Sequence, residues 1–461
     1  MSDMFDAVVI GAGSAGLAFA KGASRHGVRV AMVEEAELGG TCVNRGCVPK
    51  KMLWHVAHVH RANHAFARSG ELEQAPDVSF RRAHEAIGEH VESIRESYLD
   101  TIDERDIELV RGSARLEEDG KGVVVRVGDR TLRGGAIVIA CGTKPTMPDI
   151  PGIALCDTSN EAFAWNRAPD RLLIAGGGYI GIEFATVMAA FGSQVTIVET
   201  GDEILDGFDP DAVKLARTHL ERDGVRIVTG AKLAGVERQE GVNGSGGTLR
   251  ATVEGAEPIT CDKVLVAIGR TPRTEELGPI AAALETADSG PLKVSETFET
   301  SREGIYAIGD AADRMPLTPV ARRDGSWLAD HLFGGQDPGK PLDLDLVTTS
   351  TFCDPPIAQV GVTHANGGAD NLYVDSDIGA PLKDGLLKEE ERDNGSGSGS
   401  KTLYKLLMDG KGGPVRGAVL VSRTAPDEIG WAAAAIAAGL DLSTLRRPAP
   451  VHPTFAEELL G

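Results

Sequence analysis

The feature that most constrains the fold is a repeated unit of strand, glycine-rich turn and helix. An apolar run leads into G-x-G-x-x-G and a helix start at two places, DAVVIGAGSAGLAFA (6–20) and RLLIAGGGYIGIEFA (171–185). In each copy a second apolar strand ends on a glutamate, Glu34 or Glu199, at the same offset from the first glycine. One such turn is a weak signal. Two complete units predict an α/β protein with two Rossmann-like dinucleotide-binding domains.

The glycines have distinct roles in this unit. The first forms a tight turn, the second lets the backbone approach a pyrophosphate, and the third lets the helix pack on the strand. These roles fall on Gly11, Gly13 and Gly16 in the first copy and on Gly176, Gly178 and Gly181 in the second. The pyrophosphate would lie at the helix N-terminus. The two glutamates would bind ribose hydroxyls, or else are solvated strand ends.

Glu199 predicts which nicotinamide cofactor the second unit favours. A carboxylate at this position repels a 2′-phosphate, and no arginine follows it in TGDEILDGFD (200–209). We therefore expect NADH to be preferred, with NADPH possible.

A cysteine pair follows the first unit. Cys42 and Cys47 lie in GGTCVNRGCVPKK (39–51). Five residues of regular helix rise about 7.5 Å, beyond the roughly 7 Å Cα limit for a disulfide. A bridge here requires a distorted backbone, which Gly46 permits. The position beside a nucleotide-binding turn indicates redox chemistry, with a structural disulfide or half of a zinc site as the alternative.

Composition excludes several classes of protein. The 461 residues are too long for one core, and 25% charged with 42% hydrophobic residues is typical of globular proteins. The net charge of −21 disfavours nucleic acid and anionic membranes as partners. No apolar stretch is long enough to span a membrane, and the N-terminus has no basic leader. We expect a cytoplasmic protein, in which disulfides are mostly catalytic.

Other segments predict the domain organisation. The strand-like stretches AIVIACGTKP (136–145) and VLVAIGRTPR (264–273) read as crossovers between domains, and 240–247 reads as a hairpin tip. GIYAIGDAAD (304–313) predicts a buried strand leading to Asp310, whose carboxylate could cap the next helix and meet a cofactor hydroxyl. From residue 344 the pattern is that of a separate α+β domain, with a mobile loop at 393–400.

Four histidines follow the redox cysteines in KMLWHVAHVHRANHAF (51–66). His60 and His64 are spaced to share one helix face, as metal ligands can be. No carboxylate or cysteine falls within this run. We therefore predict a structural helix and no metal.

The two glycine units, GGTCVNRGCVPKK, AIGDAAD and the terminal HPTFAEELL together resemble the FAD-dependent pyridine nucleotide-disulfide oxidoreductases over essentially the whole chain. LTPVA (317–321) and the ending are most similar to the glutathione reductases. The resemblance implies FAD on the first unit, NAD(P)H on the second and a C-terminal dimerisation domain. The implied domains are FAD-binding at 1–145, NAD(P)H-binding at 146–272, a second FAD-binding or central part at 273–343 and dimerisation at 344–461.

The resemblance also implies individual roles. Lys50 and Glu183 match a pair beside the flavin, and Tyr179 matches a gate over the nicotinamide pocket, although a core aromatic would look the same in sequence. Besides the glycines of the first turn, the FAD site would comprise Ser14, Ala15, Glu34, Thr41, Cys42, Lys50, Ala114, Gly142, Asp310 and Thr318. Besides those of the second, the nicotinamide site would comprise Tyr179, Ile180, Glu199 and Gly269.

The implied reaction passes electrons from NAD(P)H through FAD and the Cys42–Cys47 disulfide to a small disulfide. Cys47 would be the flavin-side thiolate and Cys42 the exposed thiol that attacks the substrate. His452 is the candidate acid and base, with Glu457 able to orient its imidazole. In the family this histidine reaches the neighbouring subunit's cysteines, so a homodimer with a shared active site is expected.

Fewer residues indicate the substrate than indicate the cofactors. Ser14, Lys21 and Tyr98 match contacts for glutathione disulfide, but the family's second arginine falls on Ser326. Arg322, one helical turn earlier, could compensate. The prediction is glutathione disulfide or a close derivative. The alternatives are a dihydrolipoamide dehydrogenase and, from a different class, a flavin-binding redox sensor without turnover.

Overall fold

The computed structural model describes residues 3–70, 72–76, 78–239, 248–366, 368–369, 372–379, 401–452, 454 and 457. It divides into two compact units. The first comprises Met1–Lys50, Glu85–Thr146 and Gly269–Leu344, and the second comprises Lys51–His84, Met147–Ile268 and Asp345–Gly461. Unlike the expected domains, this division assigns the helical segment 51–84 to the second unit. The predicted hairpin tip at 240–247 and the predicted loop at 393–400 lie outside the described residues.

The first unit is built on a sheet in the order β3-β2-β1-β6-β5-β4, with β17 also paired to β6. Strands β1, β2, β3 and β17 are parallel to their neighbours, whereas β4 and β5 are antiparallel. Strand β1 is buried over its last residues, as strands covered on both faces are. The bounds are β1 (Asp3–Ile10), β2 (Val30–Glu34), β3 (Glu108–Arg111), β4 (Ala114–Glu118), β5 (Val123–Val127), β6 (Arg130–Ile139) and β17 (Ile305–Ala307).

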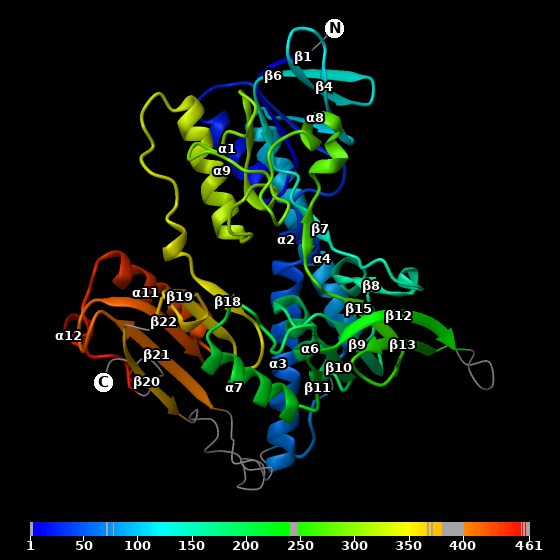
Figure 1. Ribbon diagram of the computed structural model, residues 1–461, viewed down its shortest axis with the longest axis vertical. Coiled ribbons are helices and arrows are strands. Elements are labelled where there is room, and N and C mark those ends of the chain that lie inside the picture. Colours follow the sequence, from blue (N-terminus) through cyan, green and yellow to red (C-terminus); the bar gives the residue numbers. More distant parts are fainter. Residues whose placement is uncertain are drawn as a thin grey trace. The chain divides into compact units, whose positions relative to one another are not determined.

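Helices α1 (Ser14–Ser24) and α9 (Thr318–Phe333) of the first unit lie side by side although they are far apart in the sequence (Figure 1). Glycine makes this approach possible, because a Cβ on Gly325 would lie 2.4 Å from the carbonyl oxygen of Ala15. The redox segment contains α2 (Gly40–Arg45) and leads into α3 (Cys47–Ser69). The remaining helices here are α4 (Phe80–Glu104) and the short α8 (Pro279–Ala282).

The two predicted crossovers meet in a small ribbon. Strands β7 (Thr143–Pro145) and β16 (Arg270–Pro272) pair antiparallel, with Thr271 opposite Lys144. This pairing joins the ends of the two crossovers within the first unit. The side chains of Thr143 and Arg270, one from each strand, therefore lie together.

The second unit begins with a parallel sheet in the order β11-β10-β9-β15-β8. Its strands are β8 (Asp157–Thr158), β9 (Arg171–Ala175), β10 (Gln194–Val198), β11 (Arg226–Val228) and β15 (Lys263–Val266). An antiparallel sheet follows, of β12 (Lys232–Gln239), β13 (Thr248–Glu254) and β14 (Ile259–Cys261). The helices are α5 (Ser159–Ala162), α6 (Tyr179–Ala190) and α7 (Pro210–Arg222).

The C-terminal part of this unit is an antiparallel sheet in the order β18-β19-β22-β21-β20, with α11 packed on β19 and β22 (Figure 1). The elements are β18 (Thr349–Thr351), β19 (Ile357–Gly361), β20 (Tyr373–Gly379), β21 (Thr402–Met408), β22 (Val415–Val421), α11 (Ala425–Ala437) and α12 (Leu442–Leu445). Every residue of β21 is buried. The predicted fold class, two Rossmann-like domains followed by an α+β domain, is confirmed.

None of the helices within the described part of the chain combines the length and hydrophobicity needed to cross a bilayer.

Candidate active site

The redox cysteines lie at a break between two helices. Helix α2 ends at Arg45, Gly46 leaves the helical conformation with φ −160° and ψ −119°, and Cys47 begins α3. A Cβ on Gly46 would lie 2.9 Å from the carbonyl oxygen of Thr41, so a side chain at this position would collide with the turn. The distortion that a Cys42–Cys47 bridge requires is therefore present. Both cysteines are thiols in this structure.

The two thiols differ in acidity. The hydrogen bond from Cys42 lowers the pKa of Cys47 to about 6, helped by Thr318 and by the charge of Lys50 against the opposing effect of burial. The Thr318 hydroxyl, on the first residue of α9, lies 3.5 Å from the Cys47 sulfur. The same hydrogen bond, together with burial and the Cys47 charge, raises the pKa of Cys42 above its ordinary range. Cys47 is thus the thiolate of the pair.

The two cysteines also differ in exposure. Cys42, which we expected to be the exposed thiol, is half-buried, and Cys47 is exposed on the chain alone. Cys42 lies in α2 near Ser14 and Thr318, which hydrogen-bond to it, whereas Cys47 is the first residue of α3.

The first glycine turn has the geometry of a pyrophosphate site. Gly11 has φ +107°, a conformation that favours glycine. A Cβ on Gly16 would lie 1.9 Å from the Gly11 carbonyl oxygen, because helix α1 packs tightly on the turn. A Cβ on Gly13 would meet only Gly40, at 3.8 Å, so the backbone there is open to a ligand. Glu34 closes the turn by accepting the amide hydrogen of Ala12 at 2.7 Å.

The second glycine turn repeats this arrangement. Gly176 has φ +109°, and a Cβ on Gly181 would lie 2.1 Å from the Gly176 carbonyl oxygen. Gly178 has nothing within 4 Å of its Cβ position. Glu199 accepts hydrogen bonds from the Gly177 amide at 2.6 Å and the Gly201 amide at 2.7 Å. Burial opposes these bonds, yet they hold the pKa of Glu199 below its usual value, so the carboxylate is charged.

Comparison with known proteins assigns these features to a family. The family model described as pyridine nucleotide-disulphide oxidoreductase matches residues 5–325, and that of its dimerisation domain matches 347–460. The chain belongs to the pyridine nucleotide-disulphide oxidoreductase family. Its cofactors are therefore FAD and NAD(P)H, and the dimerisation domain indicates a homodimer. The two open glycine turns, each with a carboxylate at the strand end, fit two dinucleotides.

The individual relatives of this chain include glutathione reductases and mercuric reductases. The chain is 33% identical to glutathione reductases of Nostoc sp. and Burkholderia cepacia, over 99% of this chain and 98% of each relative. It is 30% identical to a mercuric reductase of Lysinibacillus sphaericus, over 99% of this chain and 82% of that protein. Reductases with two different named substrates thus share this family.

The expectation that Asp310 caps a helix is wrong. Helix α9 starts at Thr318, after Leu317, and no side chain caps it. The Asp310 carboxylate instead lies 3.4 Å from the Thr143 hydroxyl. Burial raises the pKa of Asp310, and the charge of Arg270 and the Thr143 hydrogen bond oppose this rise. Asp310 is thus a half-buried polar group of the first unit that lies beside Thr143.

Arg270 and Thr143 were missed as site residues. Arg270 donates to the Thr143 hydroxyl and carbonyl, both at 2.8 Å, and to the Thr41 hydroxyl at 3.4 Å. These contacts connect the crossover ribbon with the redox segment and with Asp310. The basic residue after each crossover strand was the available signal, and we interpreted it only as a domain boundary.

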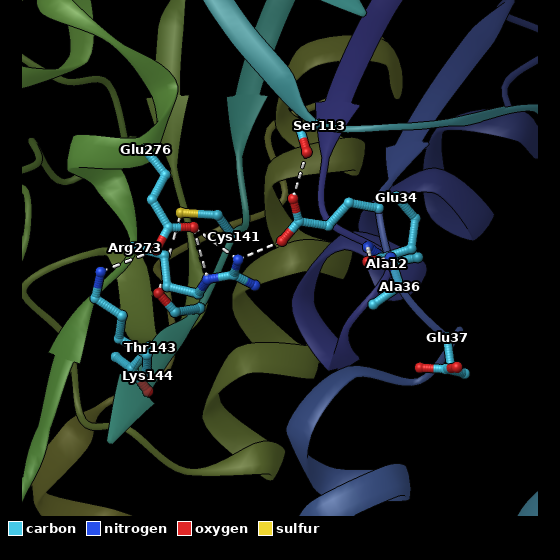
Figure 2. A network of polar contacts seen from close by, with 12 residues as sticks. Ala12, Glu34, Ala36, Glu37, Ser113, Cys141, Thr143, Lys144, Arg273 and Glu276 are labelled. Carbon is cyan, nitrogen blue, oxygen red and sulfur yellow. Dashed lines mark hydrogen bonds and ion pairs between the residues drawn. The ribbon is translucent and has the colours of Figure 1, made fainter. Parts of the chain in front are cut away.

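A polar network adjoins the Glu34 end of the first turn (Figure 2). Glu34 accepts the amide hydrogens of Ala12 and Ala36, and Arg273 donates to Glu276 at 2.6 Å. Arg273 also pairs with Glu35, the residue after Glu34. The network therefore fixes the strand end that carries the predicted ribose ligand.

The predicted substrate residues lie together in the first unit. The Lys21 ammonium is 4.8 Å from the centre of the Tyr98 ring. Burial lowers the pKa of Lys21, and the charges of Arg105 and Arg322 lower it further. Burial raises the pKa of Tyr98, as does the nearby Cys42. Arg105 was not predicted.

Four further predicted residues lie in the second unit. His452 Nδ1 and Glu457 Oε2 are 2.7 Å apart, the contact expected of an oriented imidazole. Glu183 is buried and accepts the Phe352 amide hydrogen at 2.9 Å. Tyr179 is 50% exposed at the start of α6, so it is not a core aromatic.

The remaining predicted residues belong to the scaffold around the two turns. Ala15 and Ala114 are buried, and Ile180 is half-buried in α6. Gly142 (φ +64°) and Gly269 (φ +127°) have nothing within 4 Å of a Cβ position, so both leave backbone open to a ligand.

The histidine run lies in helix α3, as predicted. His58 stacks on Trp54 and His60 stacks on Phe191, so these rings take part in packing. Within the described residues no group of three or more potential metal ligands occurs.

Proposed function

We propose that this protein is a disulfide reductase that favours NADH and acts on a low-molecular-weight disulfide, glutathione disulfide or a close derivative. The observation that carries the proposal is the unequal thiol pair, in which Cys47 has a pKa of about 6 beside a less acidic Cys42. A pair of this kind, at a helix break beside a dinucleotide turn, can open, attack and close again.

The roles of the chain's own residues follow from the difference in pKa between Cys42 and Cys47. Cys42, with its raised pKa, needs a base, and His452 paired with Glu457 is the candidate. Cys42 attacks one sulfur of the substrate, the substrate S–S bond breaks, and the departing thiolate takes a proton from His452. The Cys47 thiolate then attacks the Cys42 sulfur, which releases the second half of the substrate as a thiolate and forms the Cys42–Cys47 disulfide. FAD, when bound, supplies the route by which an electron pair from the nicotinamide reopens this bond.

The active site would be shared between two subunits, with His452 of one copy serving the cysteines of the other. Subunit complementation tests this arrangement. His452→Ala and Cys42→Ser homodimers are each expected to be inactive. Mixed after unfolding and refolding with FAD, they should regain activity, because some heterodimers contain one intact site. A mixture as inactive as its parents would contradict the shared site.

The substrate is tested with purified holoenzyme, both nicotinamides and a panel of acceptors. The panel contains glutathione disulfide, its amide, lipoamide, cystine derivatives and Hg(II). We expect NADH oxidation to be fastest with glutathione disulfide or a close derivative. Turnover with lipoamide or Hg(II) alone would refute the proposed substrate, and no turnover with any disulfide would refute the proposed reaction.

Two features support the substrate choice. Lys21 and Tyr98 are in contact and lie near Cys42, which suits a substrate with both charge and apolar surface. The glutathione reductases that resemble this chain align with it over nearly their full length. The preference for NADH is supported by the charged carboxylate of Glu199, which would repel a 2′-phosphate.

A further inference from the structure

The side chain of Asn44 fixes one end of the redox turn. Asn44 lies in α2, between Cys42 and Cys47. Its amide nitrogen donates to the carbonyl oxygens of Leu38 and Gly40, both at 2.9 Å. Leu38 precedes the helix and Gly40 is its first residue. One side chain therefore holds the beginning of α2 against its last turn.

Helix α4 holds the other side of the same amide. The Nε of Arg95 donates to the Oδ1 of Asn44 at 2.7 Å. A guanidinium has only donors and a backbone carbonyl oxygen only accepts, so the three contacts together fix the orientation of the amide. The charged donor also makes this hydrogen bond stronger than one between neutral groups. We call the four residues Leu38, Gly40, Asn44 and Arg95 the Asn44 network.

The beginning of α2 is itself attached to the first glycine turn. The Gly39 amide donates to the Ala12 carbonyl oxygen at 2.9 Å. A Cβ on Gly40 would lie 2.8 Å from the Cα of Gly13, so the two backbones are in close contact. The Asn44 network therefore joins the helix of the attacking thiol to two elements outside it, the glycine turn and α4.

The step that depends most on this rigidity is the closing of the disulfide. Cys42 attacks a substrate that can move to meet it, whereas Cys47 must reach a sulfur held in the same chain. Cys42 hydrogen-bonds to Cys47, so the two sulfurs already lie in contact. In the closing step a bond forms between them, the bond from Cys42 to the substrate half breaks, and that half leaves as a thiolate with the electron pair. A misplacement of about 1 Å can lower the rate of such a step about a hundredfold.

We propose that Arg95, acting through Asn44, is a positioning residue for the closing of the Cys42–Cys47 disulfide, and that it affects this step more than the attack on the substrate. The inference rests on the proposed disulfide reductase function and concerns the same two thiols.

Stopped-flow mixing of the reduced holoenzyme with a disulfide separates the two steps. The substrate is glutathione disulfide, or the disulfide of the panel above that the wild-type enzyme reduces fastest. The absorbance of the Cys47 thiolate persists in the mixed disulfide and is lost when the Cys42–Cys47 bond forms. Its decay at low substrate therefore measures the attack by Cys42, and its decay at saturating substrate measures the closing step. Rapid acid quenching followed by intact mass analysis measures the mixed disulfide itself.

Arg95→Met removes the donor to Asn44 and changes no group of α2 itself. We expect the closing rate to fall about tenfold and the rate of attack to change less than about twofold. The mixed disulfide should accumulate accordingly. Asn44→Ala should slow closing at least as much. The double variant should be no slower than Asn44→Ala alone, because Arg95 acts through Asn44.

Two matched controls separate this contact from the charges around it. Glu92→Gln breaks the ion pair between Arg95 and Glu92, whose atoms are 2.7 Å apart, and keeps the contact with Asn44. Arg45→Gln removes an exposed charge from α2 itself, where Arg45 lies 3.9 Å from Glu37. Both variants should close the disulfide at the wild-type rate.

The failure of this inference differs from that of the proposed function. If Arg95→Met closes the disulfide as fast as Glu92→Gln, the positioning role is refuted and the function stands. An equal loss of both rates in Arg95→Met would also refute the role, because a general loosening of the turn slows attack and closing together. A wild-type enzyme that reduces no small disulfide would refute the function itself.

Discussion

The two glycine turns have nearly the same backbone and different surroundings. Gly11 and Gly176 have φ values of +107° and +109°, and the third glycine of each turn packs against the carbonyl oxygen of the first. The first turn is followed by an unequal thiol pair, whereas the second is followed by the charged Glu199. The comparison teaches that the glycines specify where a dinucleotide can lie. Residues beyond the turn specify what is done there.

The sharpest difference is that only the first turn leads to an acidic thiol. Cys47→Ser should lower disulfide reduction by at least about a thousandfold, because no thiolate remains to close the bridge. NADH oxidation with an artificial electron acceptor such as ferricyanide should persist, since the second turn is untouched. Steady-state assays with each acceptor measure both effects.

A matched control for this prediction is Cys156→Ser. Cys156 lies in the second unit, and burial raises its pKa to about 11. Disulfide reduction by this variant should equal that of the wild type. A Cys47→Ser enzyme that kept a tenth of the wild-type rate would remove Cys47 from the reaction.

The two glycine turns have the same backbone conformation, and a substitution can disturb each of them separately. Gly16→Ala and Gly181→Ala place a methyl group about 2 Å from a backbone oxygen, and overpacking of this kind costs about 3 kcal/mol. Gly16→Ala should lose FAD, measured by flavin absorbance per protein. Gly181→Ala should keep FAD and show a raised KM for NADH.

The open glycines are the controls for this pair. Gly13→Ala and Gly178→Ala meet no atom of the protein closer than 3.8 Å. Their free energy of unfolding should stay within about 0.5 kcal/mol of the wild-type value, with any loss confined to cofactor affinity. Equal destabilisation at Gly13 and Gly16 would contradict the roles assigned to the two positions.

Local sequence signals predicted the elements that local geometry determines. The two turns, the break at Gly46 and the helix with the histidines all follow from the conformational limits of glycine or from hydrophobic spacing. The prediction for Asp310 was wrong because an aspartate before a helix looks like a helix cap in the sequence. In the structure its carboxylate lies beside the Thr143 hydroxyl, which is far away in the sequence.

Contacts between distant segments could not be predicted in the same way. Arg270 reaches Thr41, and the charge of Arg105 acts on Lys21, only because the fold brings their elements together. A single sequence marks Arg270 as a basic residue after a crossover strand, but it does not indicate which distant residue such a side chain contacts.

The carboxylates that close the two turns should act on different cofactors. Glu199→Ala should raise the ratio of kcat/KM for NADPH to that for NADH about tenfold, because the charge that repels the 2′-phosphate is removed. Glu34→Ala should weaken FAD retention and leave this ratio unchanged. Initial rates with both nicotinamides measure the ratio. A Glu199→Ala enzyme with the wild-type ratio would show that another residue selects the cofactor.

The smallest predicted effect concerns the titration of the first site. Because the pKa of Cys47 is lowered to about 6, the thiolate of the reduced enzyme should be lost as pH falls through about 6 and should form as pH rises through it. Lys50→Met removes one of the charges that favour the thiolate. The midpoint should therefore rise by about half a unit, about 0.7 kcal/mol.

The absorbance of the reduced holoenzyme, followed from pH 5 to pH 9, measures this midpoint, and the cysteines of the second unit do not interfere. Burial raises the pKa of Cys156 to about 11 and that of Cys261 and Cys353 to about 12, so none of the three titrates in this range. A thiolate transition near pH 6 therefore belongs to the first unit. A midpoint that stayed fixed in Lys50→Met would mean that the Cys42 hydrogen bond and Thr318 hold the thiolate without help from the lysine.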